Sequence, residues 1–216
     1  MFGPTCQNFV SGVIRKVSND DTPSDLRFYL MKLAIADPPY LGSAHRWYGI
    51  GGRAKGRGKG RADEHPEAYL WDKPETHILL AHKLLNEFDG FAIAGTSHSL
   101  SHYLSVIETG RENGIRVMSW IKPASIPSGS RITQSWEPVI VKVPHTRKGR
   151  NKGKQMVDYL IAAAPRRNFA GSKPTAWTHW VLDAMGYQVG DEVFDMFNGS
   201  GAVSEAIKSY RFERGL

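Results

Sequence analysis

The segment Leu-Ala-Ile-Ala-Asp-Pro-Pro-Tyr at residues 33–40 places a strand end and a rigid turn at one point in the chain. Its apolar run is too short for a helix, so we interpret it as part of a buried strand over about 31–36. Pro38 and Pro39 cannot donate hydrogen bonds to a neighbouring strand, which predicts that the strand ends near Asp37. Because open parallel sheets bind ligands at the carboxyl ends of their strands, this turn is a candidate site.

The groups on this turn suit a planar ring that carries an amine. The Asp37 carboxylate and the following main-chain carbonyl accept hydrogen bonds but cannot donate them, and the two prolines restrict their movement. Tyr40 adds a flat face on which a heterocycle can stack, a contact worth about 1–3 kcal/mol per base. The alternative interpretation is an ordinary strand-ending turn with a packed tyrosine.

The rest of the chain alternates strands with helices, which is typical of a parallel sheet. After the first strand we predict a helix over 74–88, a strand over 91–95, a helix capped by Ser97 or Ser99 and ending near 108, a strand over 115–120, an antiparallel strand over 137–143, a short strand over 157–163, and a helix from Lys173 to about 185 that Gly186 stops. Residues 1–26 have little periodicity and are expected to form a loose N-terminal arm.

A glycine-rich turn near the end of the chain is a second candidate site. We predict a strand over 192–197, a tight turn over Asn198-Gly-Ser-Gly201 and a helix over about 202–211. Glycines let the backbone approach a ligand closely, and the start of the helix supplies free N–H groups and partial positive charge. On its own such a turn is a weak signal, because any tight strand-to-helix connection can use it.

Taken together, these segments resemble the S-adenosylmethionine-dependent amino-methyltransferases of DNA. Residues 37–40 (Asp-Pro-Pro-Tyr) resemble the catalytic motif of that family, and residues 195–201 (Asp-Met-Phe-Asn-Gly-Ser-Gly) resemble its cofactor loop. With the catalytic motif first, the order resembles the permuted beta class. Residues 117–123 and 135–141 resemble the inner landmarks of that class, and 172–175 (Ser-Lys-Pro-Thr) resembles the element before its cofactor loop.

The resemblance implies an α/β fold, namely a circularly permuted, Rossmann-like methyltransferase sheet in a single domain over residues 1–216. In the family, the cofactor loop and its helix are followed by further strands that hold the ribose and the adenine. This chain ends where the first of those strands would begin, so we expect the last two strands to be missing. A homodimer or another chain would then be one way to complete the cofactor site.

The resemblance also implies roles for individual residues. The catalytic group would be Asp37, Pro38, Pro39 and Tyr40, which orient the amine of an extruded base in duplex DNA. The residues expected to hold S-adenosylmethionine are Asp195, Phe197, Asn198, Gly199, Ser200, Gly201, Lys173, Pro174 and Thr175. Aspartate rather than serine at position 37 resembles the adenine-modifying members, with cytosine-N4 methylation as the alternative. No metal is expected.

The net charge of +7 is concentrated in two segments. Residues 41–62 carry six Arg or Lys and residues 144–157 carry five, and neither segment contains an acid. We predict flexible basic loops over 41–66 and 144–156 that bind double-stranded DNA. The DNA-binding residues would be Arg46, Trp47, Arg53, Lys55, Arg57, Lys59, Arg61, Arg147, Lys148, Arg150, Lys152 and Lys154. The alternative is two solvated loops that aid solubility.

The single cysteine, Cys6, excludes an intramolecular disulfide, and the chain has no secretory leader and no apolar stretch of membrane-spanning length. We therefore expect a cytoplasmic protein, in a bacterial or phage-infected cell, that acts in a restriction-modification setting and has no membrane partner. The leading hypothesis is a DNA adenine methyltransferase. A catalytically inert DNA-binding protein on the same fold is the second, and methylation of RNA or protein is the third.

Overall fold

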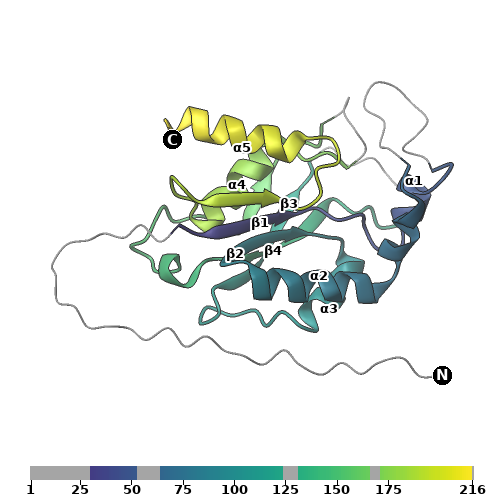
Figure 1. Ribbon diagram of the computed structural model, residues 1–216, viewed down its shortest axis with the longest axis horizontal. Coiled ribbons are helices and arrows are strands. Elements are labelled where there is room, and N and C mark those ends of the chain that lie inside the picture. Colours follow the sequence, from purple (N-terminus) through teal and green to yellow (C-terminus); the bar gives the residue numbers. More distant parts are fainter. Residues whose placement is uncertain (1–29, 53–63, 124–130, 166–170, 216) are drawn as a thin grey trace, which may run out of the picture.

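The computed structural model describes residues 30–52, 64–123, 131–165 and 171–215, and a twisted sheet runs through its centre (Figure 1). The strands are β1 (Lys32–Ala36), β2 (Gly90–Ala94), β3 (Ile115–Ile121), β4 (Trp136–Lys142), β5 (Tyr159–Ile161) and β6 (Glu192–Asp195), arranged in the order β5-β3-β4-β2-β1-β6. The helices are α1 (Ala44–Tyr48), α2 (Pro74–Glu87), α3 (Ser97–Leu104), α4 (Thr175–Met185) and α5 (Ala202–Glu213), with short 3-10 helices η2 (Pro66–Asp72) and η3 (His145–Arg147). The fold is therefore α/β, as predicted.

Strand directions decide which residues meet at each end of the sheet. β1 pairs in parallel with β2 and with β6, and β4 runs antiparallel to both β2 and β3. All the strands except β4 therefore point the same way. We call the end at which β1, β2, β3 and β6 finish the carboxyl edge, and the opposite end the amino edge.

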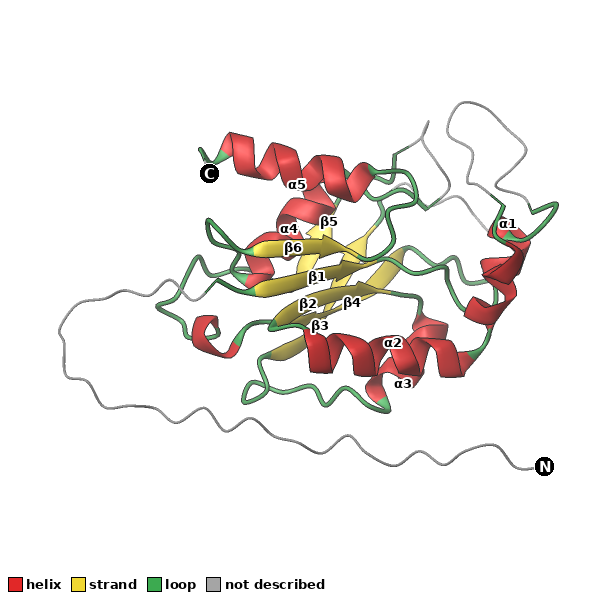
Figure 2. Ribbon diagram, in the orientation of Figure 1, coloured by secondary structure: helices red, strands yellow, loops and turns green. Residues whose placement is uncertain are grey.

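The apolar run in β1 is buried because helices cover both faces of the sheet (Figure 2). Leu33 and Ile35 belong to the core under α4 and α5, whereas Ala34 and Ala36 belong to the core under α2 and α3. Alternate residues of a strand face opposite sides, so a strand covered on both faces reads as a continuous apolar run. The prediction of a buried strand that ends at Asp37 is confirmed.

Most of the other predicted elements are confirmed, with differences at their ends. The helix predicted from 97 is capped by Thr96, not by Ser97 or Ser99, and it ends at Leu104. The Thr96 side chain accepts from the Ser99 N–H, and the Ser99 side chain accepts from the Thr96 N–H. This reciprocal pair satisfies both N–H groups at the helix start, and the Thr-x-x-Ser spacing is its signal in the sequence.

Among the described residues, no helix is both long and apolar enough to cross a membrane.

The loop after β4 is anchored at its beginning, which corrects one predicted role. The Arg147 guanidinium donates hydrogen bonds to both oxygens of the Asp191 carboxylate and to the carbonyl of Gly186. The side chains are 6% and 0% exposed, respectively. Asp191 also accepts from the main-chain N–H groups of Met31 and Gln188. Arg147 thus ties three segments together, and we withdraw it from the predicted DNA-binding residues.

We predict that Arg147→Met destabilises the fold by about 3 kcal/mol, because it leaves a buried carboxylate without its countercharge. Urea-unfolding midpoints of the purified variant would measure the effect. Arg150→Met is the matched control, since Arg150 is exposed and such surface changes stay within about 0.5 kcal/mol. Equal midpoints for the two variants would contradict a structural role for Arg147.

Candidate active site

Four charged side chains meet at the carboxyl edge of the sheet, each from a different segment. Asp37 directly follows β1, and Glu137 lies at the start of β4. Lys122 directly follows β3, and Lys173 lies just before α4. Parallel strands finish at one edge, and antiparallel β4 begins there, so segments far apart in the sequence converge on this point.

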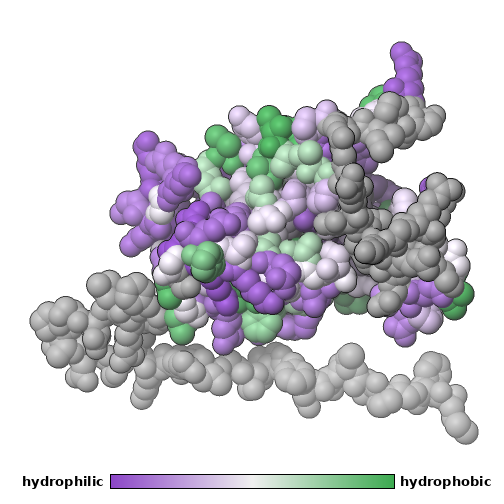
Figure 3. Space-filling view, turned by 90° about the horizontal axis from the view of Figure 1, so that it is seen from above, coloured by the Kyte–Doolittle hydropathy of each residue, from purple (hydrophilic) through white to green (hydrophobic). Residues whose placement is uncertain are grey.

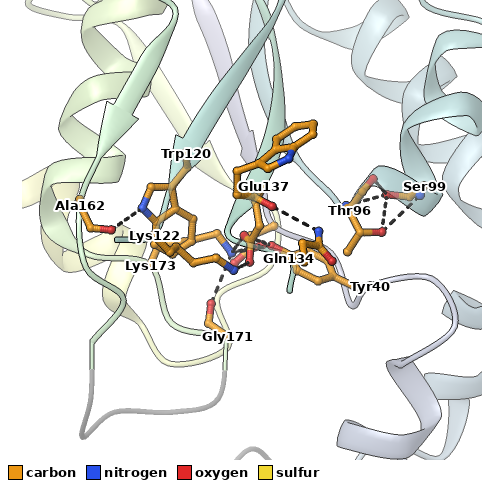
Figure 4. A network of polar contacts seen from close by, with 12 residues as sticks. Tyr40, Thr96, Ser99, Trp120, Lys122, Gln134, Glu137, Ala162, Gly171 and Lys173 are labelled. Carbon is orange, nitrogen blue, oxygen red and sulfur yellow. Dashed lines mark hydrogen bonds and ion pairs between the residues drawn. The ribbon is translucent and has the colours of Figure 1, made fainter. Parts of the chain in front are cut away.

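The four side chains are joined through Tyr40 in one hydrogen-bond network (Figure 4). Lys173 Nζ donates to Asp37 Oδ1 at 2.7 Å and to the Tyr40 hydroxyl at 2.9 Å. The Tyr40 hydroxyl donates to Glu137 Oε2 at 2.6 Å. Lys122 Nζ donates to Glu137 Oε1 at 2.7 Å, so two ammonium groups offset two carboxylates.

Burial and mutual attraction determine the charges in this network. Burial of Lys173 opposes its charge, but Asp37 and Glu137 outweigh that effect and raise its pKa, so the ammonium form persists. Burial would raise the pKa of Glu137, but Lys173 and Lys122 outweigh it and hold the pKa below its ordinary value of 4.5. Lys173 is only 2% exposed, so these interactions are weakly screened by solvent.

The pKa of the Asp37 carboxyl shifts in the opposite direction to that of Glu137. Burial raises its pKa above the ordinary value of 3.8, and the neighbouring Glu137 adds to this, while Lys173 opposes it. The Asp37 side chain remains 19% exposed, so a ligand in the adjoining space can reach it. Burial raises the pKa of Tyr40 well above 10, so its hydroxyl stays protonated and donates.

Two cavities adjoin this network and share part of their walls. One, which we call the glycine-turn cavity, has a volume of about 400 Å³. The other, which we call the aromatic cavity, has a volume of about 380 Å³. Asp37, Tyr48, Gly171 and Lys173 line both. A ligand in one cavity would therefore lie against the same carboxylate and ammonium groups as a ligand in the other.

The glycine-turn cavity is lined by most of the residues predicted to hold a cofactor. These are Asp195, Phe197, Asn198, Gly199, Ser200, Gly201 and Lys173. Gly201, the N-cap residue of α5, has a φ of +74°, a left-handed conformation that favours glycine. Asp195 Oδ2 accepts from the Ser204 hydroxyl at 2.8 Å, which fixes the turn against the first part of the helix. Pro174 and Thr175, also predicted, are the cap and first residue of α4 and are not among the lining residues.

The aromatic cavity is lined by the rings of Tyr40, Trp47 and Tyr48. Of the predicted catalytic turn, Pro38 and Tyr40 line this cavity, Pro39 lines the glycine-turn cavity, and Asp37 lines both. The Tyr40 hydroxyl is held by Glu137 and Lys173, which fixes the orientation of the ring.

The predicted DNA-binding residues fall into three groups. Arg46 and Trp47 lie in α1 at the carboxyl edge. Lys148, Arg150, Lys152 and Lys154 follow β4 and line a separate cleft at the amino edge. Arg53, Lys55, Arg57, Lys59 and Arg61 lie outside the described residues.

Sequence reasoning did not find Glu137, Lys122 or the contact between Lys173 and Asp37. The signal for Glu137 is an acid inside an otherwise apolar strand, since a buried carboxylate requires a partner. Among the described residues, no group of three or more His, Cys, Asp or Glu side chains is placed to hold a metal ion.

No protein-family model and no curated protein sequence matches this chain. Two solved structures are similar to it in fold. The M1.HpyAVI–SAM complex is 19% identical over 84% of this chain and 80% of that one, with a TM-score of 0.51. The structure of M1.HpyAVI is 17% identical over 84% of this chain and 77% of that one, with a TM-score of 0.50. The similarity shows that the chain shares the fold of these two structures.

We predict that Glu137→Gln destabilises the fold by about 2 kcal/mol at pH 7, because a buried charge partner of two lysines is lost. Folding lowers the pKa of Glu137 below 4.5. The ionised side chain therefore contributes fully to the free energy of unfolding above pH 4.5, and this contribution is lost as the pH falls through the lower pKa of the folded state. The difference in free energy of unfolding between wild type and Glu137→Gln should therefore become smaller at acidic pH. Urea unfolding across this pH range would measure it, with the exposed Glu75→Gln as control. A difference that stays constant in acid would contradict the assignment.

Proposed function

We propose that this protein transfers a methyl group from S-adenosylmethionine to the exocyclic amine of an adenine extruded from double-stranded DNA. The observation that carries the proposal is the shared wall of the two cavities. Asp37 and Lys173 face both the space beside the glycine turn and the space beside the aromatic rings. A methyl donor and a planar acceptor could therefore reach one carboxylate from opposite sides.

The residues of the glycine-turn cavity fit S-adenosylmethionine. The cavity volume of about 400 Å³ lies within the range of about 300–1,000 Å³ usual for such ligands. The start of α5 offers main-chain N–H groups to a carboxylate, and Asp37 and Asp195 offer negative charge to a cation. The cofactor supplies an activated methyl group on a positively charged sulfur. The fold similarity to a protein solved with SAM adds support.

The catalytic turn would orient the acceptor amine. The Asp37 carboxylate and the Pro38 carbonyl accept its two hydrogens, and the nitrogen lone pair then points toward the glycine-turn cavity. The carboxylate also stabilises the positive charge that develops on nitrogen. This is catalysis by position and electrostatics rather than by a strong base. Lys173 holds the Asp37 side chain in place through the 2.7 Å ion pair.

The aromatic cavity would receive the base. Tyr40, Trp47 and Tyr48 offer stacking faces, and each stacked base gains about 1–3 kcal/mol, which offsets part of the cost of extruding it from the duplex. Arg46, which is exposed in α1, would contact phosphates. Aspartate at position 37 supports adenine as the target, with cytosine as the alternative.

The arrangement of the strands supports the permuted class. The first and last strands of the described residues, β1 and β6, are parallel neighbours, and each is followed at the carboxyl edge by one of the two functional turns. β6 is the edge strand of the described sheet. In a permuted enzyme of this class, the strands that follow the cofactor loop would continue the sheet beyond β6.

A second candidate function is DNA binding without catalysis. The observation that favours it is the ion pair between Lys173 and Asp37, which already occupies one oxygen of the proposed acceptor. Calorimetry with S-adenosylmethionine distinguishes the two functions, because an inert relative would bind DNA but not the cofactor.

We predict that Asp37→Ala lowers methyl transfer at least about 100-fold, since it removes a fixed acceptor for the amine. Incubation of duplex DNA with labelled S-adenosylmethionine would measure transfer, and substrates containing only adenine or only cytosine targets would identify the base. Glu75→Ala, on the exposed start of α2, is the control and should match wild type. Absence of transfer by the wild type, or equal rates with Asp37→Ala, would reject the function.

We also predict that the transfer rate falls on acidification. Asp37 accepts a hydrogen bond from the amine only when it is ionised, and burial raises its pKa above 3.8. The rate should therefore decline as the pH falls, with a midpoint above 3.8. Single-turnover rates measured across a pH series would show this. A midpoint at or below that value would contradict the role of a buried Asp37.

A further inference from the structure

The second basic segment lies at the far end of the sheet from the candidate active site. β4 enters the sheet at the carboxyl edge with Glu137 and leaves it at the amino edge after Lys142. Five residue steps separate these positions, which corresponds to about 17 Å of strand. The residues that follow β4 line a cleft of about 600 Å³, which we call the distal cleft.

The distal cleft carries an excess of positive charge without internal partners. Five of its basic side chains form no ion pair or hydrogen bond within the described part of the chain: Arg111, Arg116, Arg150, Lys152 and Lys154. The acidic side chains among its lining residues are Asp158 and Asp183. Asp183 already pairs with Arg214 at 2.7 Å and accepts from the Tyr210 hydroxyl. Asp158 alone is left to offset the five cations.

Side-chain contacts within the fold hold the loop that lines the distal cleft. Arg147 anchors the loop after β4 through its buried pair with Asp191. Lys148 donates to the main-chain carbonyl of Glu112, which joins this loop to the turn before β3. The two loops are thereby held together, and the cleft is lined by Arg111 from one loop, Arg150 from the other and Arg116 from the start of β3. Figure 3 shows hydrophilic residues over much of one face of the molecule, including its left end.

We propose that the distal cleft binds the phosphate backbone of DNA as a second contact, separate from the site that receives the target base. Several cations spread along a cleft of this size match a linear polyanion better than one isolated phosphate, because duplex DNA presents a negative charge about every 1.7 Å. The span of about 17 Å along β4 between the two edges of the sheet corresponds to about five base pairs of duplex. The choice of DNA as the polyanion rests on the proposed function.

The cleft would anchor the protein without reading sequence. Contacts to phosphates fix position and orientation on the duplex but carry no base information. Such an anchor holds the enzyme on DNA while the aromatic cavity samples bases. It also explains why the basic residues after β4 lie far from the catalytic turn.

The test compares two variants that each lose three positive charges. The cleft variant is Arg150→Gln, Lys152→Gln and Lys154→Gln. The control variant is Lys73→Gln, Lys83→Gln and Lys208→Gln, three exposed residues that do not line the cleft. Affinity for a labelled duplex of about 30 base pairs, roughly 100 Å long, would be measured without cofactor at several salt concentrations. Urea midpoints would show that both variants remain folded.

The cleft variant should bind DNA about tenfold or more weakly near 0.1 M salt. The slope of log affinity against log salt should fall in magnitude by about 2.7, or about 0.9 for each lost phosphate contact. The control variant should stay within about threefold of wild type, because its lysines lie outside the distal cleft. Equal losses in the two variants, or no loss in the cleft variant, would overturn the proposal.

Two further measurements separate this proposal from the proposed function. Glu75→Gln should bind the duplex as wild type does, because Glu75 is exposed and lines neither the distal cleft nor the two cavities at the carboxyl edge. If the cleft variant loses affinity while the wild type transfers no methyl group, the distal contact stands and the proposed function fails. Stronger competition by structured RNA than by duplex DNA would overturn DNA as the occupant.

Discussion

The ion pair between Lys173 and Asp37 joins two segments that lie 136 residues apart in the chain, at the carboxyl edge of the sheet. A lysine that is 2% exposed is stable in charged form only because two carboxylates face it. The pair also fixes geometry. It holds the start of α4 against the end of β1. The parallel pairing of β6 with β1 places the glycine turn beside the proline turn.

The rest of the network follows from that contact. Lys173 also donates to Tyr40, which donates to Glu137, which accepts in turn from Lys122. Each charged or hydroxyl group of this network is therefore partnered. Removing one member would leave its neighbours without a partner, at a desolvation cost of about 1–3 kcal/mol or more. The carboxylate that remains partly open to a ligand is Asp37. Glu137 thus serves mainly to hold the network together, whereas Asp37 is the acid that a ligand can contact.

The sequence was sufficient to predict features that depend on local rules. The buried strand before Asp37 follows from its apolar run, and the stop of α4 at Gly186 follows from a left-handed glycine. The partners of Arg147 and Glu137 could not be predicted, because they come from segments up to about a hundred residues away. A basic loop favours a polyanion partner, but an arginine that pairs with a buried acid within the protein does not add to that argument. Charge counts alone therefore did not reveal the buried pair between Arg147 and Asp191.

The antiparallel direction of β4 explains how one strand serves both ends of the sheet. A parallel strand would begin at the amino edge and deliver its following loop to the carboxyl edge, together with the other functional turns. β4 instead begins beside Lys122 with Glu137 and ends beside the turn before β3. The same reversal places an acid in the active-site network and sends the basic loop to the opposite edge. The proposed active site and the proposed contact with the DNA backbone are therefore separated by the topology of the strands. A count of charges along the sequence does not contain this information.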